Sequence, residues 1–313
     1  MRLIDDISIF LENQRFACSH QKRGGFEVIC TSTLDGREPR LILPLEISAP
    51  SEDDAYRDAE AASGCISAIC EKEGYPLIIT EDRWHSQGAM TRSRLLAHLE
   101  VFCQAYARNC EVRKIDKTVA KEFLEANHSY GDAACRYRYG LFLKRYTGKA
   151  LGSARDDRPE PGTLVAVATF SNARKWKKGD KEIRSYEWTR YASIPGLRIN
   201  GGMGKLLKTF IKEVAPDDIM SYADLEWSEG NVYSQLGFIL EGHKEPVTFM
   251  VDTRTWKRFP VRPGMTGPDG SGMKEPDGSD MNGQDGSGMK EEDRRFFRNF
   301  GSNKYRFKLT EYE

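Results

Sequence analysis

The sequence predicts an α/β protein in two parts, in which a smaller α/β domain precedes a larger domain with a mixed central sheet flanked by helices. Apolar runs of strand length alternate with amphipathic stretches of helix length along most of the chain. The 313 residues are enough for about two domains, and 39% hydrophobic with 30% charged residues is ordinary for globular domains. In the second half, a glycine-rich turn opens a helical apolar stripe between two strand patterns.

The first domain is expected at residues 1–115. Its strands are predicted from apolar, β-branched runs at Phe26–Thr33, Arg40–Ser48 and Tyr75–Thr80. Ser51 with Asp54 three residues later is typical of a helix N-terminus, and Gly74 indicates where that helix ends. A second helix is expected near residues 89–106. Its apolar face consists of Leu95, Leu96, Leu99, Phe102 and Cys103.

The second domain is expected at residues 116–260. Its strand patterns lie at Tyr137–Arg145, Leu164–Ser171, Tyr186–Ser193, Ile219–Ala223 and Val247–Val251. One helix is predicted at Thr118–Asn127 and another at residues 203–214, before Pro216. The second helix has a complete apolar stripe, formed by Met203, Leu206, Leu207, Phe210, Ile211 and Val214.

An acidic, repetitive segment follows at residues 261–295. Within it, residues 264–293 contain two basic and eight acidic side chains, although the formal net charge of the chain is zero. The triplet Asp-Gly-Ser recurs every eight residues, but the period and apolar anchors of a calcium-binding β-helix are missing. We therefore expect a flexible insertion. Residues 296–313 are expected to contain a strand that returns to the larger sheet.

The cysteines and the N-terminus favour a reducing, cytoplasmic location. Seven cysteines without a CxxC pair argue against a disulfide framework and against a zinc site, so no metal is expected. The N-terminus carries acidic residues where a signal peptide needs an apolar core. No run approaches the ~18 apolar residues of a membrane span, so no membrane partner is expected.

The first candidate site is the glycine-rich turn at Asn200–Lys205. Glycines allow the backbone to approach a phosphate, and amides at a helix N-terminus carry partial positive charge. The candidate ligands for a phosphate group are Arg198, Gly201, Gly202, Gly204 and Lys205. The alternative is a loop-to-helix glycine cluster that binds no phosphate.

The second candidate site follows this helix. Ser221–Asp224 is an apolar strand that ends in a carboxylate, and Glu229–Phe238 contains a polar loop, a helical turn with a tyrosine and a Gly-Phe pair. The order of these elements resembles the GCN5-related N-acetyltransferase (GNAT) superfamily. The resemblance implies that the glycine turn binds acetyl-CoA or a related acyl-CoA, that Asn231 lies near this cofactor, and that Tyr233 protonates the departing thiolate. Met203 departs from the family pattern, which has glycine or alanine there.

The general base of such a transferase has three candidates. Asp224 ends its strand just before the Tyr233 segment, Glu187 lies in the strand before the glycine turn, and His128 closes the first helix of this domain. Each has a structural alternative. Asp224 and Glu187 are also explained as strand-end or surface charges, His128 as a helix-end residue, and Tyr233 as packing for its helical turn.

A narrower resemblance leads to the GNAT branch that includes the phage Mom DNA-modification protein and modules associated with homing-endonuclease-like proteins. It covers about residues 118–250. The matching elements contain His128, Ser129, Tyr130, Ser221, Asp224 and Tyr233. This resemblance implies a phage-related role with a nucleobase in DNA as the acceptor.

In those relatives the upstream domain is a Vsr-like or PD-(D/E)XK nuclease. Such an enzyme needs clustered carboxylates for Mg²⁺ and usually a nearby lysine. The candidate carboxylates here are Glu27, Glu46 and Asp82, and Ser48 stands where the lysine would lie. We therefore interpret the first domain as a possible degenerate nuclease fold with a binding or scaffolding role.

Two basic stretches are candidates for contact with DNA. Arg136–Lys149 has five basic residues interleaved with aromatic ones, which is also explained by a strand with buried rings and solvated charges. The second stretch resembles a hairpin loop with a central tryptophan, formed by Arg174, Lys175, Trp176, Lys177 and Lys178.

Two functions therefore follow from the sequence. The first is a GNAT-like acyltransferase that uses acetyl-CoA or a related donor, with a nucleobase or an amine as acceptor. The alternative is a non-catalytic GNAT-fold module that binds nucleic acid in a phage or mobile-element DNA-processing system. Met203 favours the alternative, and the Asn231–Tyr233 segment favours the enzyme. The sequence does not determine the oligomeric state.

Overall fold

The computed structural model describes residues 1–152, 158–261 and 289–311. They form two compact units, each assembled from separate chain segments. Unit 1 consists of Met1–Thr91, Asp224–Glu229 and His243–Ser302, and unit 2 of Arg92–Ala223, Gly230–Gly242 and Asn303–Glu313. Most of the predicted acidic insertion lies outside the described residues, and the domain boundaries at 115 and 260 remain predictions.

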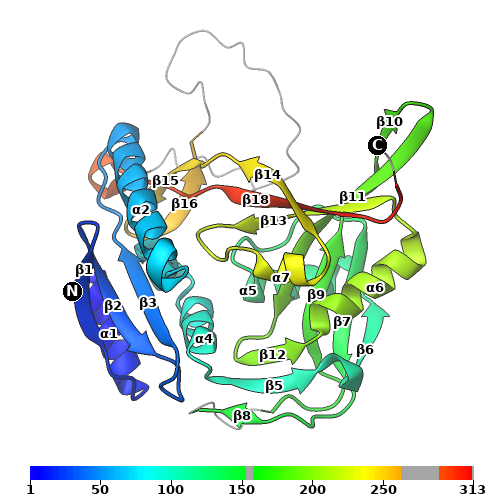
Figure 1. Cartoon of the computed structure of the whole chain (residues 1–313), viewed down its shortest axis with the longest axis horizontal. Helices are drawn as coiled ribbons and strands as arrows, with labels where there is room; N and C mark the ends of the chain where they lie inside the picture. Colours follow the sequence, from blue (N-terminus) through cyan, green and yellow to red (C-terminus); the bar gives the residue numbers. More distant parts are fainter. Residues whose placement is uncertain (153–157, 262–288, 312–313) are drawn as a thin grey trace. The chain divides into compact units, whose positions relative to one another are not determined.

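Unit 1 contains a four-stranded sheet in the order β1-β2-β3-β4, in which only β3 and β4 are parallel. Figure 1 labels its first three strands. Its first elements are α1 (Leu3–Asn13), β1 (Ser19–Arg23), β2 (Phe26–Ser32), β3 (Pro39–Leu45), α2 (Glu52–Glu73), β4 (Leu77–Thr80) and α3 (Glu81–Ser86). The crossover helix α2 begins at the predicted cap, because the Ser51 hydroxyl accepts the Asp54 amide. Its apolar side, including Ile66 and Ile69, packs on Val28 and Leu43 of the sheet.

A second, antiparallel sheet of unit 1 has the order β16-β15-β17. Its elements are β15 (Thr248–Asp252), β16 (Lys257–Pro260), η2 (Glu291–Asp293) and β17 (Arg294–Arg298). An isolated bridge joins Ala49, which follows β3, to Phe296 of β17. Unit 1 therefore contains late segments of the chain as well as its beginning.

The predicted helix at 89–106 is wrong in its second half. Helix α4 spans Gly88–His98, and Phe102–Tyr106 is the strand β5. The helix ends because Glu100 has a φ of 66°, in the left-handed region that right-handed helices cannot continue through. Phe102 and Cys103 are therefore buried as strand residues and do not lie on a helix face.

Unit 2 is built on a mixed sheet in the order β14-β18-β13-β11-β9-β7-β6, with β10 attached to β11. Its strands are β6 (Cys110–Lys114), β7 (Tyr137–Leu143), β9 (Leu164–Phe170), β10 (Arg174–Lys178), β11 (Lys181–Ser193), β13 (Asp218–Asp224), β14 (Ile239–Lys244) and β18 (Ser302–Lys308). The pairs β6–β7, β7–β9 and β9–β11 are antiparallel, whereas β11–β13 is parallel. The prediction of a mixed sheet flanked by helices is confirmed.

Helices cover both faces of this sheet. Helix α5 (Lys117–Asn127) packs on Val167 of β9, and α6 (Gly202–Val214) packs on the neighbouring residues Ala166 and Ala168. Successive residues of a strand point to opposite faces, so α5 and α6 lie on opposite sides. The remaining elements of unit 2 are η1 (Ala107–Asn109), β8 (Ala150–Leu151), β12 (Leu197–Asn200) and α7 (Asn231–Gln235). Strands β12, β5 and β8 form a small second sheet of unit 2.

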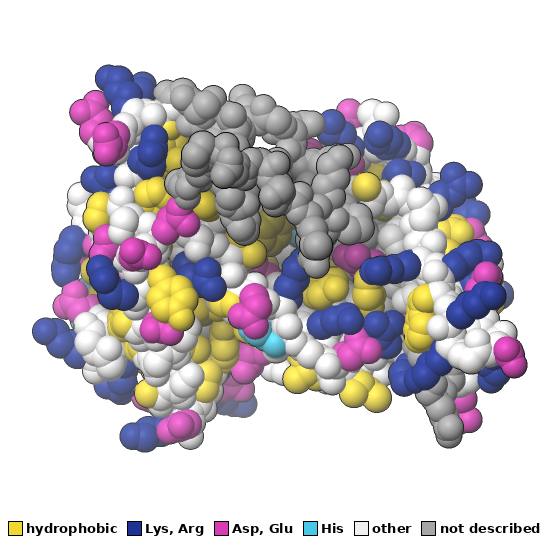
Figure 2. Space-filling view, turned by 90° about the horizontal axis from the view of Figure 1, so that it is seen from above, with side chains coloured by type: hydrophobic (Ala, Val, Ile, Leu, Met, Phe, Trp, Pro, Cys, Tyr) yellow, Lys and Arg dark blue, Asp and Glu magenta, His cyan; other side chains and the backbone are white. Residues whose placement is uncertain are grey.

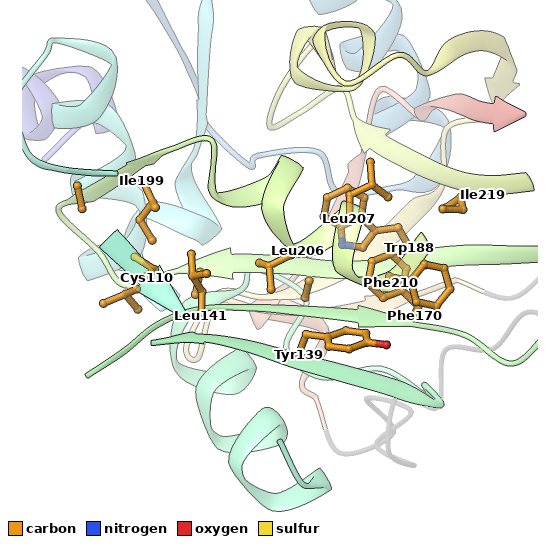
Figure 3. Packing of buried hydrophobic residues seen from close by; sticks show 14 of the residues in the cluster. Cys110, Tyr139, Leu141, Phe170, Trp188, Ile199, Leu206, Leu207, Phe210 and Ile219 are labelled. Atoms are coloured by element: carbon orange, nitrogen blue, oxygen red, sulfur yellow. The ribbon is translucent and has the colours of Figure 1, made fainter. Parts of the chain in front are cut away.

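The core under α6 is rich in aromatic side chains (Figure 3). Phe210 of α6 lies parallel to Phe170, with ring centroids 3.9 Å apart. Trp188 of β11 stacks on the same Phe170 at 5.4 Å, and Tyr139 meets it edge-on. This packing fixes α6 on the strands that carry the candidate site.

Candidate functional site

The central feature of unit 2 is the point where two parallel strands stop pairing. Strands β11 and β13 pair only from Ser185–Asp218 to Glu187–Met220, although both strands continue beyond these residues. At the same level, β11 shifts its register against β9 between Trp188 and Arg190. A bulge of this kind bends a strand and increases its twist. The strand edges beyond Glu187–Met220 are therefore not joined to each other by the regular ladder.

Ser221 and Tyr233 lie at this divergence. Ser221 Oγ lies 3.0 Å from the carbonyl oxygen of Trp188 and 2.9 Å from Tyr233 Oη. Tyr233 comes from α7, and its ring stacks on Tyr305 of β18 with centroids 5.2 Å apart. Burial raises the pKa of Tyr233, so its hydroxyl is protonated at neutral pH, as a proton donor requires.

The backbone before α7 holds this tyrosine in place. Gly230 has a φ of 84°, and a Cβ there would lie 2.7 Å from Tyr305 Cε2 and 2.8 Å from Ala223 Cβ. Only glycine fits this position without displacing its neighbours. Asn231, the first residue of α7, is exposed, and its role as a cofactor ligand remains a prediction.

The glycine-rich turn adjoins α7. Gly201 has a φ of 76° and is the N-cap of α6. A Cβ on Gly204 would lie 3.3 Å from Leu236 Cδ2, directly after α7, and a Cβ on Gly202 would lie 3.3 Å from Tyr191 Oη. The first turn of α6 and the Tyr233 helix are therefore neighbours, and a Cβ at Gly202 or Gly204 would make this packing tighter by a few tenths of an ångström.

The two basic residues of the turn differ in their surroundings. Lys205 Nζ donates to the carbonyl oxygens of Ala107 at 2.9 Å and Cys110 at 2.6 Å. The Lys205 ammonium thus ties α6 to η1 and β6. The exposed guanidinium of Arg198 lies 5.2 Å from the centre of the Phe102 ring. Arg198 is the better placed of the two cations to reach a soluble anion.

The three candidate bases occupy different environments. Glu187 is half-buried beside the strand divergence, and its negative charge adds a small part to the raised pKa of Tyr233, which is due mainly to burial. His128 is the C-cap of α5, and its Nδ1 accepts the Tyr130 amide at 3.1 Å. Asp224 belongs to unit 1, where its carboxylate lies 3.4 Å from the Arg83 guanidinium. The role of each of the three as a general base remains a prediction.

The predicted basic loop is a β-hairpin. Arg174–Lys178 forms β10 and pairs with β11, and Gly179 turns the chain with a φ of 59°. Arg174, Lys175, Lys177 and Lys178 are exposed, and Trp176 is half-buried. Lys175 pairs with Glu182 across the hairpin at 2.8 Å. On the face shown in Figure 2, basic and acidic side chains are interspersed and do not form one large basic patch.

The candidate nuclease carboxylates of unit 1 do not all meet. Glu27 and Glu46 line one pocket of about 350 Å³. The Arg2 guanidinium lies 2.7 Å from Glu27. Asp82 does not line this pocket and forms an ion pair with Arg258. Among the described residues, no group of three or more His, Cys, Asp or Glu side chains could hold a metal ion.

Sequence reasoning missed two features of the site. The first is the requirement for glycine at position 230, which the sequence analysis did not predict although a glycine directly before a short helix is a recognisable signal. The second is Asp132, in the loop after α5, whose buried Oδ1 atom has no hydrogen-bond partner among the described residues and which no sequence pattern singled out. No helix among the described residues is long and apolar enough to cross a membrane.

Comparison with known proteins leaves the family open. No family model matches the chain, and no curated protein matches it. One similar solved structure is a variant of the AtaT toxin bound to the C-terminus of the antitoxin AtaR and acetyl-CoA, with 13% identity over 43% of this chain and 87% of that chain, and a TM-score of 0.26. Another is the KacTA–DNA complex, with 16% identity over 42% of this chain and 86% of that chain, and a TM-score of 0.25. Because both TM-scores are low, neither likeness assigns a residue, a ligand or an activity to this chain.

Proposed function

We propose that unit 2 is a GNAT-like acyltransferase that takes its acyl group from acetyl-CoA or a related thioester. The observation that carries this proposal is the divergence of β11 and β13 directly beside the Ser221–Tyr233 pair. Diverging strand edges present peptide groups that can pair with the amide groups of a pantetheine arm. A proton donor stands at the same place, where a thiolate must leave.

The residues of the glycine turn fit the phosphate end of such a donor. The first-turn amides of α6 present partial positive charge, and Gly201 gives the turn its left-handed conformation. Arg198 supplies the exposed positive charge, because Lys205 is held by backbone carbonyls. Gly202 and Gly204 let the first turn of α6 pack closely on Tyr191 and Leu236, and Asn231 at the start of α7 completes the predicted set. Met203 packs with the core and adds no polar group.

The chemistry assigned to the side chains is general acid–base catalysis. When bound, acetyl-CoA supplies an acyl carbon attached to sulfur. Glu187 would take a proton from the attacking amine as its nitrogen bonds to the acyl carbon, and Tyr233 would give its proton to the sulfur as the carbon–sulfur bond breaks. Ser221 orients the Tyr233 hydroxyl for this transfer. Asp224 and His128 remain weaker candidates for the base, because Asp224 is committed to Arg83 and His128 to the Tyr130 amide.

Calorimetric titration of acetyl-CoA into the purified protein tests this proposal. We expect micromolar binding that falls by about tenfold or more in Arg198→Glu, because a phosphate contact is replaced by repulsion. Lys208→Glu makes the same charge change at an exposed position later in α6 and should bind like the wild type. If the wild type does not bind acetyl-CoA, the acyltransferase proposal is wrong.

Turnover tests the chemistry separately. Tyr233→Phe should lower kcat by about 100-fold or more while acetyl-CoA affinity changes little, because the general acid is lost. Ser221→Ala should show a smaller loss, since Tyr233 keeps its hydroxyl but not its partner. An unchanged kcat in Tyr233→Phe would remove the tyrosine from the mechanism.

The β10–β11 hairpin favours a second candidate function, nucleic-acid binding. Its four exposed basic side chains around Trp176 are suited to phosphate contact and base stacking. A DNA nucleobase as acceptor would join both functions. Binding of a DNA duplex and a single strand, measured over a range of salt concentrations, should weaken in Trp176→Ala and in Lys177→Glu. Salt-dependent DNA binding without acetyl-CoA binding would support the non-catalytic module.

A further inference from the structure

The pocket of about 350 Å³ in unit 1 is lined by helix α2 and by strands of both sheets of that unit. Its walls include Leu45 of β3 and Phe297 of β17, and both side chains are buried. The volume is at the lower end of the range found for small-molecule sites. Every lining residue belongs to unit 1, and none of them is a residue of the proposed acyltransferase site.

Small side chains of α2 create the space for this pocket. Ala55, Ala59 and Ala62 line it, and their spacing of four and three residues places them on one face of the helix. Ile66 and Ile69 continue the same face and pack on the four-stranded sheet. The helix therefore closes on the sheet where its side chains are large and leaves an apolar pocket where they are alanines. An apolar group of a ligand would be removed from water here.

Five charged side chains also line the pocket, and three of them already have partners within unit 1. The Arg2 guanidinium lies 2.7 Å from the Glu27 carboxylate, so these two charges neutralise each other. Glu46 Oε1 accepts the first backbone amide of α1 at 3.0 Å. The charges open to a ligand are therefore those of Asp58 and Arg298.

Asp58 and Arg298 have opposite charges and do not pair with each other. Asp58 is exposed on α2 and forms no hydrogen bond or ion pair with another described residue. Half-buried Arg298 donates to Thr248 Oγ1 at 3.1 Å and lies 5.2 Å from the centre of the Tyr56 ring, but no described carboxylate pairs with it. Removing a cation from water is unfavourable unless negative charge compensates for it. The pocket thus offers one unmatched anion and one unmatched cation.

We propose that this pocket binds a free α-amino acid with an apolar side chain. The ammonium group of the ligand pairs with Asp58, and its carboxylate accepts from Arg298, whose planar guanidinium matches the two oxygens. The apolar side chain lies between the alanine face of α2 and Phe297. A simple cation or a simple anion leaves one of the two charges unmatched, whereas a zwitterion matches both. This inference does not depend on the acyltransferase proposal.

Calorimetric titration of the full chain with L-phenylalanine and two analogues tests the ligand class. Phenethylamine lacks the carboxylate and hydrocinnamate lacks the ammonium group, while both keep the aromatic ring. We expect phenylalanine to bind with a Kd below about 1 mM and each analogue to bind about tenfold more weakly or worse, because one charged hydrogen-bonding partner is lost.

Matched variants of α2 place the ligand in the pocket. Asp58→Asn should weaken phenylalanine binding about tenfold, and Asp53→Asn, at an exposed position that does not line the pocket, should bind like the wild type. Ala59→Leu fills the pocket and should abolish binding, whereas Ala61→Leu makes the same change on the exposed side of the helix and should not. Urea unfolding of each variant checks that it is folded.

The outcomes decide the proposal directly. Weaker binding in Asp58→Asn and Ala59→Leu, with normal binding in both controls, supports it. Absence of binding at about 10 mM phenylalanine overturns it. Equal affinity for phenylalanine and either analogue overturns it too, because only one of the two charges would then contribute. Wild-type affinity in Ala59→Leu would show that the amino acid binds elsewhere, which refutes the pocket.

Discussion

Replacing Glu226 by glutamine should destabilise unit 1 by about 3–5 kcal/mol, which is the usual cost of removing one partner from a buried ion pair. The Glu226 carboxylate accepts from Arg83 Nε at 2.5 Å, from two nitrogens of Arg258 at 2.7 and 2.8 Å, and from Thr80 Oγ1 at 3.1 Å. Its side chain is 1% exposed. A glutamine amide would turn a donor toward two guanidinium groups that are themselves donors, so those hydrogen bonds are lost and not replaced.

The pH dependence of this effect follows from the same charges. Burial alone raises the pKa of Glu226, but the charges of Arg258 and Arg83 outweigh it and hold the pKa well below its usual value. Because the folded-state pKa is depressed, the stabilisation is complete above the unfolded value of about 4.3 and is lost as the pH falls toward the folded value. The difference between wild type and Glu226→Gln should therefore shrink in acid.

Urea unfolding followed by circular dichroism measures the loss, and hydrogen exchange assigns it to unit 1 or unit 2. Glu292→Gln is the matched control, because the Glu292 side chain is 75% exposed and pairs only loosely with Lys290 at 3.5 Å. The control should change stability by about 0.5 kcal/mol or less. A loss below about 1 kcal/mol in Glu226→Gln, or faster exchange in unit 2 alone, would refute the reasoning.

Three further predictions concern unit 2. Phe210→Ala should cost about 3–5 kcal/mol in urea unfolding, since it empties the centre of the aromatic core. Gly230→Ala should cost about 1–3 kcal/mol and lower thiol release from acetyl-CoA, because its Cβ would collide with Tyr305 and displace α7; unchanged activity would contradict this reading. The hydrogen bond from Arg306 lowers the pKa of Glu241 to about 2, and the Glu241 side chain is partly exposed. Glu241→Gln should therefore reduce the free energy of unfolding by at most about 1 kcal/mol at neutral pH. The reduction should become smaller as the pH falls below about 4, which urea midpoints would measure.

Local pattern predicted the elements of unit 2 well where one face of the element is buried. The apolar stripe of residues 203–214 became α6, which spans Gly202–Val214, and the strand predicted at 219–223 became β13. The helix predicted at 89–106 failed because the apolar spacing of Phe102 and Cys103 suits a strand as well as a helix. Only the left-handed backbone at Glu100 separates the two elements, and a glutamate carries no signal for that conformation.

Local sequence patterns could not predict which segments of the chain assemble into unit 1. Its buried ion cluster contains Arg83, Glu226 and Arg258. Arg83 and Glu226 are more than a hundred residues apart in the sequence, and the sequence alone suggests that all three are surface charges. Three separate segments of the chain contribute to this unit. Sequence separation hides such pairing because burial is decided by tertiary contacts and not by the residue types alone. The same reason hid the buried Asp132 oxygen.

The site itself depends on one side chain that interrupts regular structure. Where β11 and β13 could continue to pair, Ser221 Oγ instead contacts the Trp188 carbonyl, and the same oxygen reaches Tyr233. The serine hydroxyl has one hydrogen, so it can donate to only one of these oxygens at a time. Exchange of that hydrogen between the Trp188 carbonyl and the tyrosine would alter how firmly Tyr233 holds its own proton. Ser221 therefore links the place where the strands diverge with the acidity of the proposed proton donor. Both properties depend on contacts with Trp188 and Tyr233, so the Ser221–Asp224 strand pattern alone could not predict them.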